Sequence, residues 1–390
     1  MNDDLQGWWH ARFRASPLFA LVAHDELPPG ERAAFAALAG RGDYFGLLMP
    51  DTGLALSTKA VGPDTAALLR ALQQPGHLPG ALRDSVSAAQ QQALLQLIVD
   101  GILEIETAGG FVCGPRAAGL VPAAAQARAE PVGLLQRMSL QALEAAAACR
   151  SLPPLALSSR LYRHHTAPLT PAWQQRWAGV ADTRVLLGLD PGSALGALLF
   201  EHYEETPHAA WHLWQRQDLA LRDETLALPF KLYISLHPEA LAPGLRLAVE
   251  ALVQAAVPAF KLARGPAGLL RPDKLIAYVE NTAQRDALAA RLRPVLDGLR
   301  AQGVPFTCAL TDDGLLSWGS DPPAGNRLLN WQRIESWRSW ITRRLAFALV
   351  QARGSGAAPA DCVAFALERL RMARVDTHTW SPAEDAWHEE

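Results

Sequence analysis

The sequence predicts a mixed α+β protein with more than one domain. Two alternating segments, Lys231–Leu236 and Lys274–Val279, are typical of strands. Between them, Leu245, Val249 and Leu252 recur at steps of three and four and predict a helix. A third candidate strand is Phe306–Leu310. A chain of 390 residues is long enough for two or three domains and a sizeable core.

Composition and charge argue against several classes of protein. Hydrophobic residues make up 49% of the chain and charged residues 19%, which indicates a globular chain. The formal net charge of -3 argues against a protein whose whole surface binds nucleic acid. No apolar run reaches the roughly 18 residues of a membrane span. The first residues are acidic and lack an apolar signal core, so we expect a cytoplasmic protein that binds neither nucleic acid nor a membrane.

The sequence predicts neither a disulfide framework nor a metal site. The four cysteines are far apart and form no CxxC pair: Cys113, Cys149, Cys308 and Cys362. Such cysteines are typical of reduced structural residues. His208 and His212 have a spacing that can hold a metal on a helix, but no HExxH glutamate or third ligand accompanies them. We therefore expect a helix surface there, with Trp211 and Trp214 turned inward.

The N-terminal region predicts short strands and helices in a regular order. Tyr44–Leu48 and Leu54–Ser57 are predicted strands around a Pro-Asp-Thr-Gly turn. Asp64 is expected to cap a helix that runs through Leu72. A further helix is predicted at Ala88–Val99, and the segments ILEIE and GGFVCG after it predict a hairpin. This order of elements is a small winged-helix pattern.

The same region resembles the PqqD-like recognition element of enzymes that modify ribosomally made peptides. The resemblance is carried by GLALSTKAVGPDTAALLRAL and QQALLQLIVDGILEIE, between Asp43 and Glu106. It implies that a leader peptide binds as an added strand at the sheet edge. The groove would lie between the strand at Leu54–Ser57 and the helix at Gln91–Val99. Four apolar residues would line it: Leu54, Leu56, Leu94 and Ile98.

A winged helix can also bind DNA or serve as a structural module. The helix AAQQQALLQLIVDG has no arginine or lysine to meet phosphates, which argues against DNA readout. A winged-helix regulator would need a basic face on residues 43–107, and the sequence does not predict one.

The middle of the chain predicts a linker followed by a polar segment. Residues 115–150 are rich in alanine and predict a linker with a helix from Gly133 onward. The Pro153-Pro154 step marks a boundary. His164 and His165 are adjacent and cannot share one face of a helix or strand, so a solvated helix end is favoured over a phosphate or peptide contact.

The C-terminal region predicts two helices and a tail. Apolar residues at helical spacing, including Trp337, Ile341 and Leu345, predict core-packed helices at about 331–353 and 359–371. The last residues predict a mobile acidic tail.

One lysine is a candidate general base. Lys261 lies between Phe260 and Leu262, so alternation would point it opposite to both. Burial lowers the pKa of a lysine and can make it a base. Four nearby cations are candidates to hold a phosphate: Lys231, Arg264, Arg271 and Lys274. Composition alone favours ordinary surface cations at strand ends.

The segments KLYISLHPEAL, AFKLARGPAG, LLRPDKLIAYV and LLSWGSDPP resemble the HopA-type effector family. That family includes lyases of class V lanthipeptide and thioviridamide-like pathways and is distantly similar to the OspF/SpvC phosphothreonine lyases. The likeness covers about Leu155 to Arg353, in the order strand, helix, Phe-Lys strand, Arg/Lys-led strand and Gly-rich turn. It implies elimination of phosphate from phosphoserine or phosphothreonine, without a metal or organic cofactor, to give dehydroalanine or dehydrobutyrine.

The resemblance also implies roles for individual residues. Lys261 matches the general base, and Tyr233 occupies the place of a histidine acid. A phenol donates a proton less readily than an imidazolium, so the acid is Tyr233, or a residue such as His164 or His165, or the site has lost activity. His237 is not at the motif position, though it lies close in sequence to Tyr233.

For the phosphate, the resemblance implies Lys231, Arg271 and Lys274. A further phosphate-binding arginine is expected from the C-terminal helix. Arg338, Arg343 and Arg344 are all candidates, and we select Arg343 as the expected one.

The expected organisation is a winged-helix peptide-recognition domain at 1–115, a helical linker at 116–154 and a lyase-like domain at 155–390. The expected function is maturation of a ribosomally made precursor peptide. A separate Ser/Thr peptide kinase would supply the phosphate, since the chain has neither a GxxxxGK[ST] loop nor a kinase signature. The alternative is a non-catalytic adaptor that binds the precursor through a decayed lyase fold.

Overall fold

The structure is a computed structural model that describes residues 8–50, 58–83, 86–120, 133–178, 180–218, 228–322 and 335–382. It is a mixed α+β fold with several antiparallel sheets, which confirms the predicted class at that level. Contacts divide the chain into two compact units. The first holds Met1–Arg128, Ala147–Ser151 and Leu345–Met372, and the second holds Ala129–Ala146, Leu152–Arg344 and Ala373–Glu390. The division at 116–154 stays a prediction.

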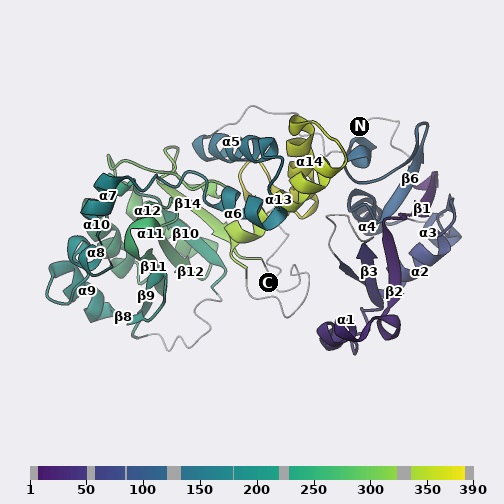
Figure 1. Ribbon diagram of the computed structural model, residues 1–390. Coiled ribbons are helices and arrows are strands. Elements are labelled where there is room, and N and C mark those ends of the chain that lie inside the picture. The colour runs from purple at the N-terminus through teal and green to yellow at the C-terminus, as the bar shows by residue number, and fades with distance from the viewer. Residues whose placement is uncertain are drawn as a thin grey trace. The chain divides into compact units, whose positions relative to one another are not determined.

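Two small antiparallel sheets lie in the first unit, with strand orders β5-β1-β6-β7 and β2-β3-β4 (Figure 1). The strands are β1 Arg12–Ala15, β2 Phe19–Ala23, β3 Gly46–Pro50, β4 Lys59–Val61, β5 Gly76–His77, β6 Leu103–Thr107 and β7 Gly110–Val112. The hairpin predicted after the helix is confirmed, since β6 pairs with β7. The first predicted strand of the Pro-Asp-Thr-Gly hairpin corresponds to β3, whereas Leu54–Ser57 lies outside the described residues.

Several helices of the first unit begin at a proline or directly after a capping residue. They are α1 Pro29–Ala34, α2 Pro63–Ala71, α3 Gly80–Arg83, α4 Ala88–Val99 and α14 Pro359–Met372. The predicted helix α4 is confirmed, and Ser87 caps it by accepting a hydrogen bond from the Gln90 backbone at 3.2 Å. Asp64 does not cap α2. Pro63 begins that helix, so Asp64 lies inside its first turn.

A seven-stranded antiparallel sheet forms the centre of the second unit, in the order β13-β14-β10-β12-β11-β9-β8. The strands are β8 Tyr203–Thr206, β9 Trp211–Arg216, β10 Phe230–Ile234, β11 Ala259–Ala263, β12 Leu275–Val279, β13 Cys308–Ala309 and β14 Leu316–Ser320. A two-stranded sheet of β15 (Val375–Asp376) and β16 (Ser381–Pro382) also belongs to this unit. The strands expected at 231–236 and 274–279 are confirmed as β10 and β12, each within two residues at its ends.

Three expectations about this sheet were wrong. The segment around His212 is strand β9 and not a helix, so Trp211 and Trp214 point to opposite faces. Leu316–Ser320 is strand β14, paired with β10, where a Gly-rich turn was expected. The strand predicted at 306–310 is reduced to Cys308–Ala309, since Phe306 has a φ of 62° and cannot continue a strand.

One face of this sheet is apolar and covered by helices. These are α8 Val180–Leu187, α9 Ala194–His202, α10 Leu241–Gln254 and α12 Thr282–Val295, which lie beside the strands in Figure 1. Alternate strand residues such as Leu232, Phe260 and Leu262 pack with these helices in one core. The apolar spacing predicted for the helix between the strands is therefore that of α10 against the sheet.

The opposite face carries polar and aromatic side chains. The remaining helices of the second unit are α5 Leu134–Ala148, α6 Pro154–Tyr162, α7 Pro171–Arg176, α11 Gly265–Leu269 and the first part of α13 (Trp337–Gly354). Hydrogen bonds tie α6 and α13 together, with Ser158 Oγ 3.3 Å from Thr342 Oγ1. Among the described residues, every helix is too short or too polar to span a bilayer.

Candidate functional site

Lys261 lies in the middle of β11, between β12 and β9. Phe260 and Leu262 are buried in the apolar core, so Lys261 points to the other face, as the alternation predicted. Its Nζ atom lies 4.4 Å from the centroid of the Trp211 ring and 5.3 Å from that of the Tyr278 ring. Both rings stabilise the ammonium group by cation–π contact.

Lys231 lies on the same face, two strands away from Lys261. It pairs in register with Tyr278, and its Nζ atom is 5.5 Å from the centroid of that ring. Its ammonium group forms an ion pair with Asp321, and both side chains are nearly buried, at 7% and 8% exposed. The other Asp321 oxygen accepts a hydrogen bond from the Trp337 backbone at 2.8 Å. Lys231 is therefore committed to a carboxylate that the sequence did not identify.

The environment of Lys261 lowers the pKa of its ammonium group to about 8. Burial is the largest cause, and the positive charge of Lys231 adds to it. The carboxylates of Asp273 and Asp321 oppose both effects. A sizeable fraction of Lys261 is therefore neutral near physiological pH, which is the form that a general base requires.

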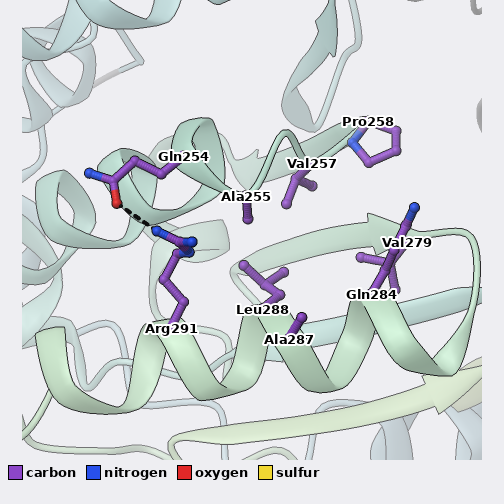
Figure 2. Close-up of a pocket in the computed structure, with 9 residues that line it drawn as sticks. All are labelled: Gln254, Ala255, Val257, Pro258, Val279, Gln284, Ala287, Leu288 and Arg291. Carbon is purple, nitrogen blue, oxygen red and sulfur yellow. Dashed lines mark hydrogen bonds between the residues drawn. The ribbon is translucent and has the colours of Figure 1, made fainter.

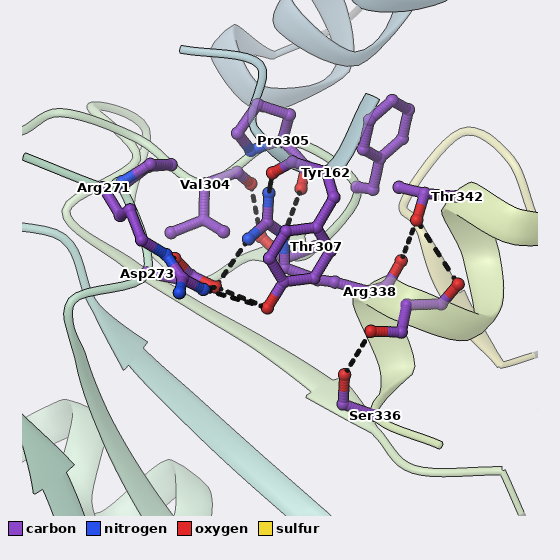
Figure 3. A network of polar contacts seen from close by, with 12 residues as sticks. Tyr162, Arg271, Asp273, Val304, Pro305, Thr307, Ser336, Arg338 and Thr342 are labelled. Atoms are coloured by element: carbon purple, nitrogen blue, oxygen red, sulfur yellow. Dashed lines mark hydrogen bonds and ion pairs between the residues drawn. The ribbon is translucent and has the colours of Figure 1, made fainter. Parts of the chain in front are cut away.

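A buried carboxylate, Asp273, joins three other side chains in a network that Figure 3 shows. Arg271 donates to both of its oxygens, at 2.9 and 2.8 Å, and Arg338 donates from Nη1 at 2.7 Å. The Tyr162 hydroxyl donates at 2.9 Å. Burial would raise the pKa of Asp273, but the charges of Arg338 and Arg271 outweigh it and hold that pKa well below its usual range.

This network orients the Arg271 guanidinium toward the ring that also contacts Lys261. The Arg271 guanidinium lies 5.1 Å from the centroid of the Trp211 ring, the ring that also contacts Lys261. Its side chain is 26% exposed, and its Nη1 atom donates to no acceptor among the described residues. Arg271 is thus held rigidly on one edge and open on another, which suits an anion such as phosphate.

Tyr233 is buried on the same face of the sheet. In register, Lys261 and Tyr233 lie on either side of Ile276, so their Cα atoms are roughly 10 Å apart at two strand spacings. The Tyr233 ring packs with Ile276 and Val304. Burial, with a smaller contribution from Asp321, raises the pKa of Tyr233 well above its usual value. The phenol therefore keeps its proton.

Lys274 serves the protein interior instead of an anion site. Its Nζ atom donates to the Leu236 carbonyl and to Gln302 Oε1, both at 2.6 Å, and its side chain is fully buried. Burial lowers its pKa to about 7. Burial lowers the pKa values of His165 and His237, and the charge of Lys274 adds a smaller contribution in the same direction. The geometry therefore gives no support to Lys274 as a phosphate ligand.

The three C-terminal arginines have different positions. Arg338 is 1% exposed and belongs to the Asp273 network. Arg343, the arginine expected to bind phosphate, is half exposed and forms an ion pair with Glu335 at 3.1 Å. The Arg344 guanidinium lies 3.8 Å from the centroid of the Trp340 ring. Arg338 is thus the one whose charge belongs to the network beside Lys261, and a phosphate contact by Arg343 stays a prediction.

The expected peptide groove of the first unit is only partly described. Leu54 and Leu56 lie outside the described residues. Leu94 and Ile98 are 3% and 2% exposed and pack in the core of the first unit, so they offer almost no surface to a peptide. β4 lies at one edge of the three-stranded sheet, and β2 lies at the other.

His208 and His212 do not form a pair. His212 is fully buried on β9, where its Nδ1 atom lies 2.6 Å from Glu205 Oε1, and Arg184 also binds that carboxylate. Among the described residues, no group of three or more His, Cys, Asp or Glu side chains could hold a metal ion.

Two hollows of the second unit are lined by described residues. A hollow of about 290 Å³, on the helix-covered side, lies between the end of α10 and α12 (Figure 2). Its single charged lining residue is Arg291, which donates to Gln254 at 3.0 Å. A larger hollow of about 690 Å³ is bordered by α6, α11 and α13 and includes Arg271 and Arg343. Lys261, Tyr233, Lys231 and Lys274 are not among the residues that line it.

We expect Asp273→Asn to destabilise the protein by about 3–5 kcal/mol, because it leaves the buried guanidinium group of Arg338 and the partly buried one of Arg271 without a countercharge. Chemical denaturation of the full chain measures the effect. The matched control is Asp286→Asn, whose exposed pair with Arg285 should contribute at most about 1 kcal/mol. Equal unfolding midpoints for the two variants would show that the network contributes little.

The lysine pKa values can be measured directly, because the chain has only four lysines: Lys59, Lys231, Lys261 and Lys274. In protein labelled with ¹³C-lysine, the Lys261 resonance should titrate with a pKa of about 8. Lys231→Met removes a neighbouring positive charge and frees Asp321, so both effects should raise the pKa of Lys261. Lys231→Arg keeps the charge and should not. An ordinary lysine pKa for Lys261 in the unaltered protein would contradict the burial argument.

The sequence matches no family model, and no curated protein matches it. The solved structures that are similar to part of the chain include two described as effector proteins, from Pseudomonas syringae pv. syringae strain 61 and pv. tomato strain DC3000. Sequence identity is 14% for each, and the TM-scores are 0.37 and 0.38. The matches cover 65% and 66% of this chain and 99% of each effector chain. TM-scores this low support no assignment, so the chain is placed only as weakly similar to these effectors.

Proposed function

We propose that the second unit eliminates phosphate from phosphoserine or phosphothreonine in a ribosomally made precursor peptide. The observation that carries the proposal is Lys261, a half-buried lysine with a pKa lowered to about 8, next to a rigidly held and partly open Arg271. A tuned base beside an anion-binding guanidinium is the pair of groups that phosphate elimination needs.

In the proposed reaction, neutral Lys261 removes the proton from Cα of the phosphorylated residue. The electrons of that C–H bond form the Cα=Cβ double bond, and the Cβ–O bond breaks with its electron pair leaving on phosphate. Arg271 binds the phosphate and stabilises the charge that grows on the leaving oxygen. Tyr233, which keeps its proton, is the proposed donor to that oxygen.

Lys231 has a different proposed role from the one the family resemblance implies. It is already paired with Asp321, so it acts on the pKa of Lys261 through its charge instead of holding phosphate. The first unit is proposed to bind the leader peptide as an added strand, for which β4, at the edge of its sheet, is the described candidate. A separate kinase would supply the phosphorylated peptide.

The second candidate function is a non-catalytic adaptor that binds the same precursor. The observation that favours it is the buried phenol at position 233, because an acid with a pKa raised well above its usual value protonates a leaving group poorly. The two candidates differ in one measurable step, since only the lyase changes the mass of the bound peptide.

To test the base, purified protein is incubated with a leader-bearing phosphoserine peptide and the product is weighed. The unaltered protein should release phosphoric acid from the peptide. Lys261→Arg keeps the positive charge but cannot lose its proton, so it should reduce the rate by at least about 100-fold. Added primary amines should partly restore Lys261→Ala. Peptide binding without any mass change in the unaltered protein would leave the adaptor, and full activity of Lys261→Arg would exclude Lys261 as the base.

The pH dependence follows from the direction of the pKa shift. The base must be neutral, so the elimination rate at low substrate should rise with pH and level off above about 8. Lys231→Met should move this rise to higher pH, and Lys231→Arg should leave it in place. A rate that is flat between pH 6 and pH 9, roughly the span of such a titration, would contradict a lysine base.

A further inference from the structure

The charged side chains that line the larger hollow of the second unit are all positive. Its volume of about 690 Å³ is in the range of sites that bind drug-sized ligands. Among the described residues, no aspartate or glutamate lines it. The charged residues that line it are four arginines: Arg163, Arg264, Arg271 and Arg343. Hydroxyl groups complete the polar lining, from Ser158, Ser159, Tyr162, Thr166, Ser339 and Thr342.

Two of these arginines have no carboxylate partner among the described residues. Arg163 is exposed, and Arg264 donates from Nη1 to the His208 carbonyl at 3.0 Å. The Arg264 Nε atom and the Thr166 hydroxyl are buried and bond to no acceptor or donor in the described part of the chain. Two guanidinium groups without a carboxylate partner in the wall of one hollow are suited to an anionic ligand.

The hollow meets the proposed reaction site at Arg271. That residue lines the hollow and also shares the Trp211 ring with Lys261. Ala210, another lining residue, immediately precedes Trp211 in the chain. A peptide with its phosphorylated residue at Lys261 would therefore place neighbouring residues in the hollow.

We propose that this hollow binds anionic side chains of the substrate peptide next to the reacting residue, and that these are carboxylates. The inference rests on the proposed function, whose substrate class it narrows to phosphopeptides with acidic flanks. Guanidinium groups bind carboxylates through paired N–H donors, and the hydroxyls can donate to the remaining oxygens. A second phosphoryl group shares this chemistry and is separated from carboxylates by the experiment.

The test measures binding of three phosphoserine peptides to the full chain by fluorescence anisotropy. Their flanking residues are glutamate, glutamine or a second phosphoserine. The Glu-flanked peptide should bind at least tenfold more tightly than the Gln-flanked peptide, and the ratio should shrink in higher salt. Arg163→Met with Arg264→Met should bring the ratio close to one, and Arg163→Met alone should lower it if the double variant unfolds.

The matched control is Arg246→Met with Arg291→Met, two arginines outside this hollow, and it should keep the full ratio. Equal affinity for the Glu-flanked and Gln-flanked peptides would overturn the inference. A gain with the second phosphoserine alone would overturn the assignment to carboxylates. A preference for the Glu-flanked peptide without any elimination of phosphate would support carboxylate binding in the hollow and contradict the lyase activity. The two proposals can therefore fail separately.

Discussion

The carboxylate of Asp273 is the group on which the polar face of the second unit depends. It receives hydrogen bonds from Arg271, Arg338 and Tyr162, which come from the segment before β12, from α13 and from α6. A buried charge costs several kcal/mol unless it is paired, so these three elements are held together by one electrostatic requirement. The same bonds decide where the open edge of the Arg271 guanidinium points.

The pKa of Lys261 results from a balance that involves the same groups. Burial and the charge of Lys231 lower it, whereas Asp273 and Asp321 limit the fall. A bound phosphate would add negative charge beside the ammonium group and would therefore raise this pKa again. In the proposed reaction, binding of the phosphate would therefore change the basicity of Lys261.

The two faces of the central sheet differ in polarity. One face is a continuous apolar core with α8, α9, α10 and α12, which needs no polar group to hold it together. The other face can therefore carry lysines and tyrosines, provided that each is paired or stacked. Lys274 and Lys261 illustrate the difference. Lys274 donates to the Gln302 side chain and a carbonyl, whereas the contacts of the Lys261 ammonium group among the described residues are with the rings of Trp211 and Tyr278.

The sequence by itself determined the strand at Lys261, the face to which Lys261 points and the helix α10, because periods of two and of three to four depend only on local geometry. It could not reveal Asp321 as the partner of Lys231, since the family resemblance implies a turn where β14 lies and the two residues are 90 positions apart. Only the tertiary structure decided which cations act together. Arg271 and Arg338 converge on Asp273, whereas Lys274, next to Asp273 in the chain, turns its ammonium group to Leu236 and Gln302. The physical reason is that buried charges pair according to their distance in space. The order of residues along the chain does not give that distance.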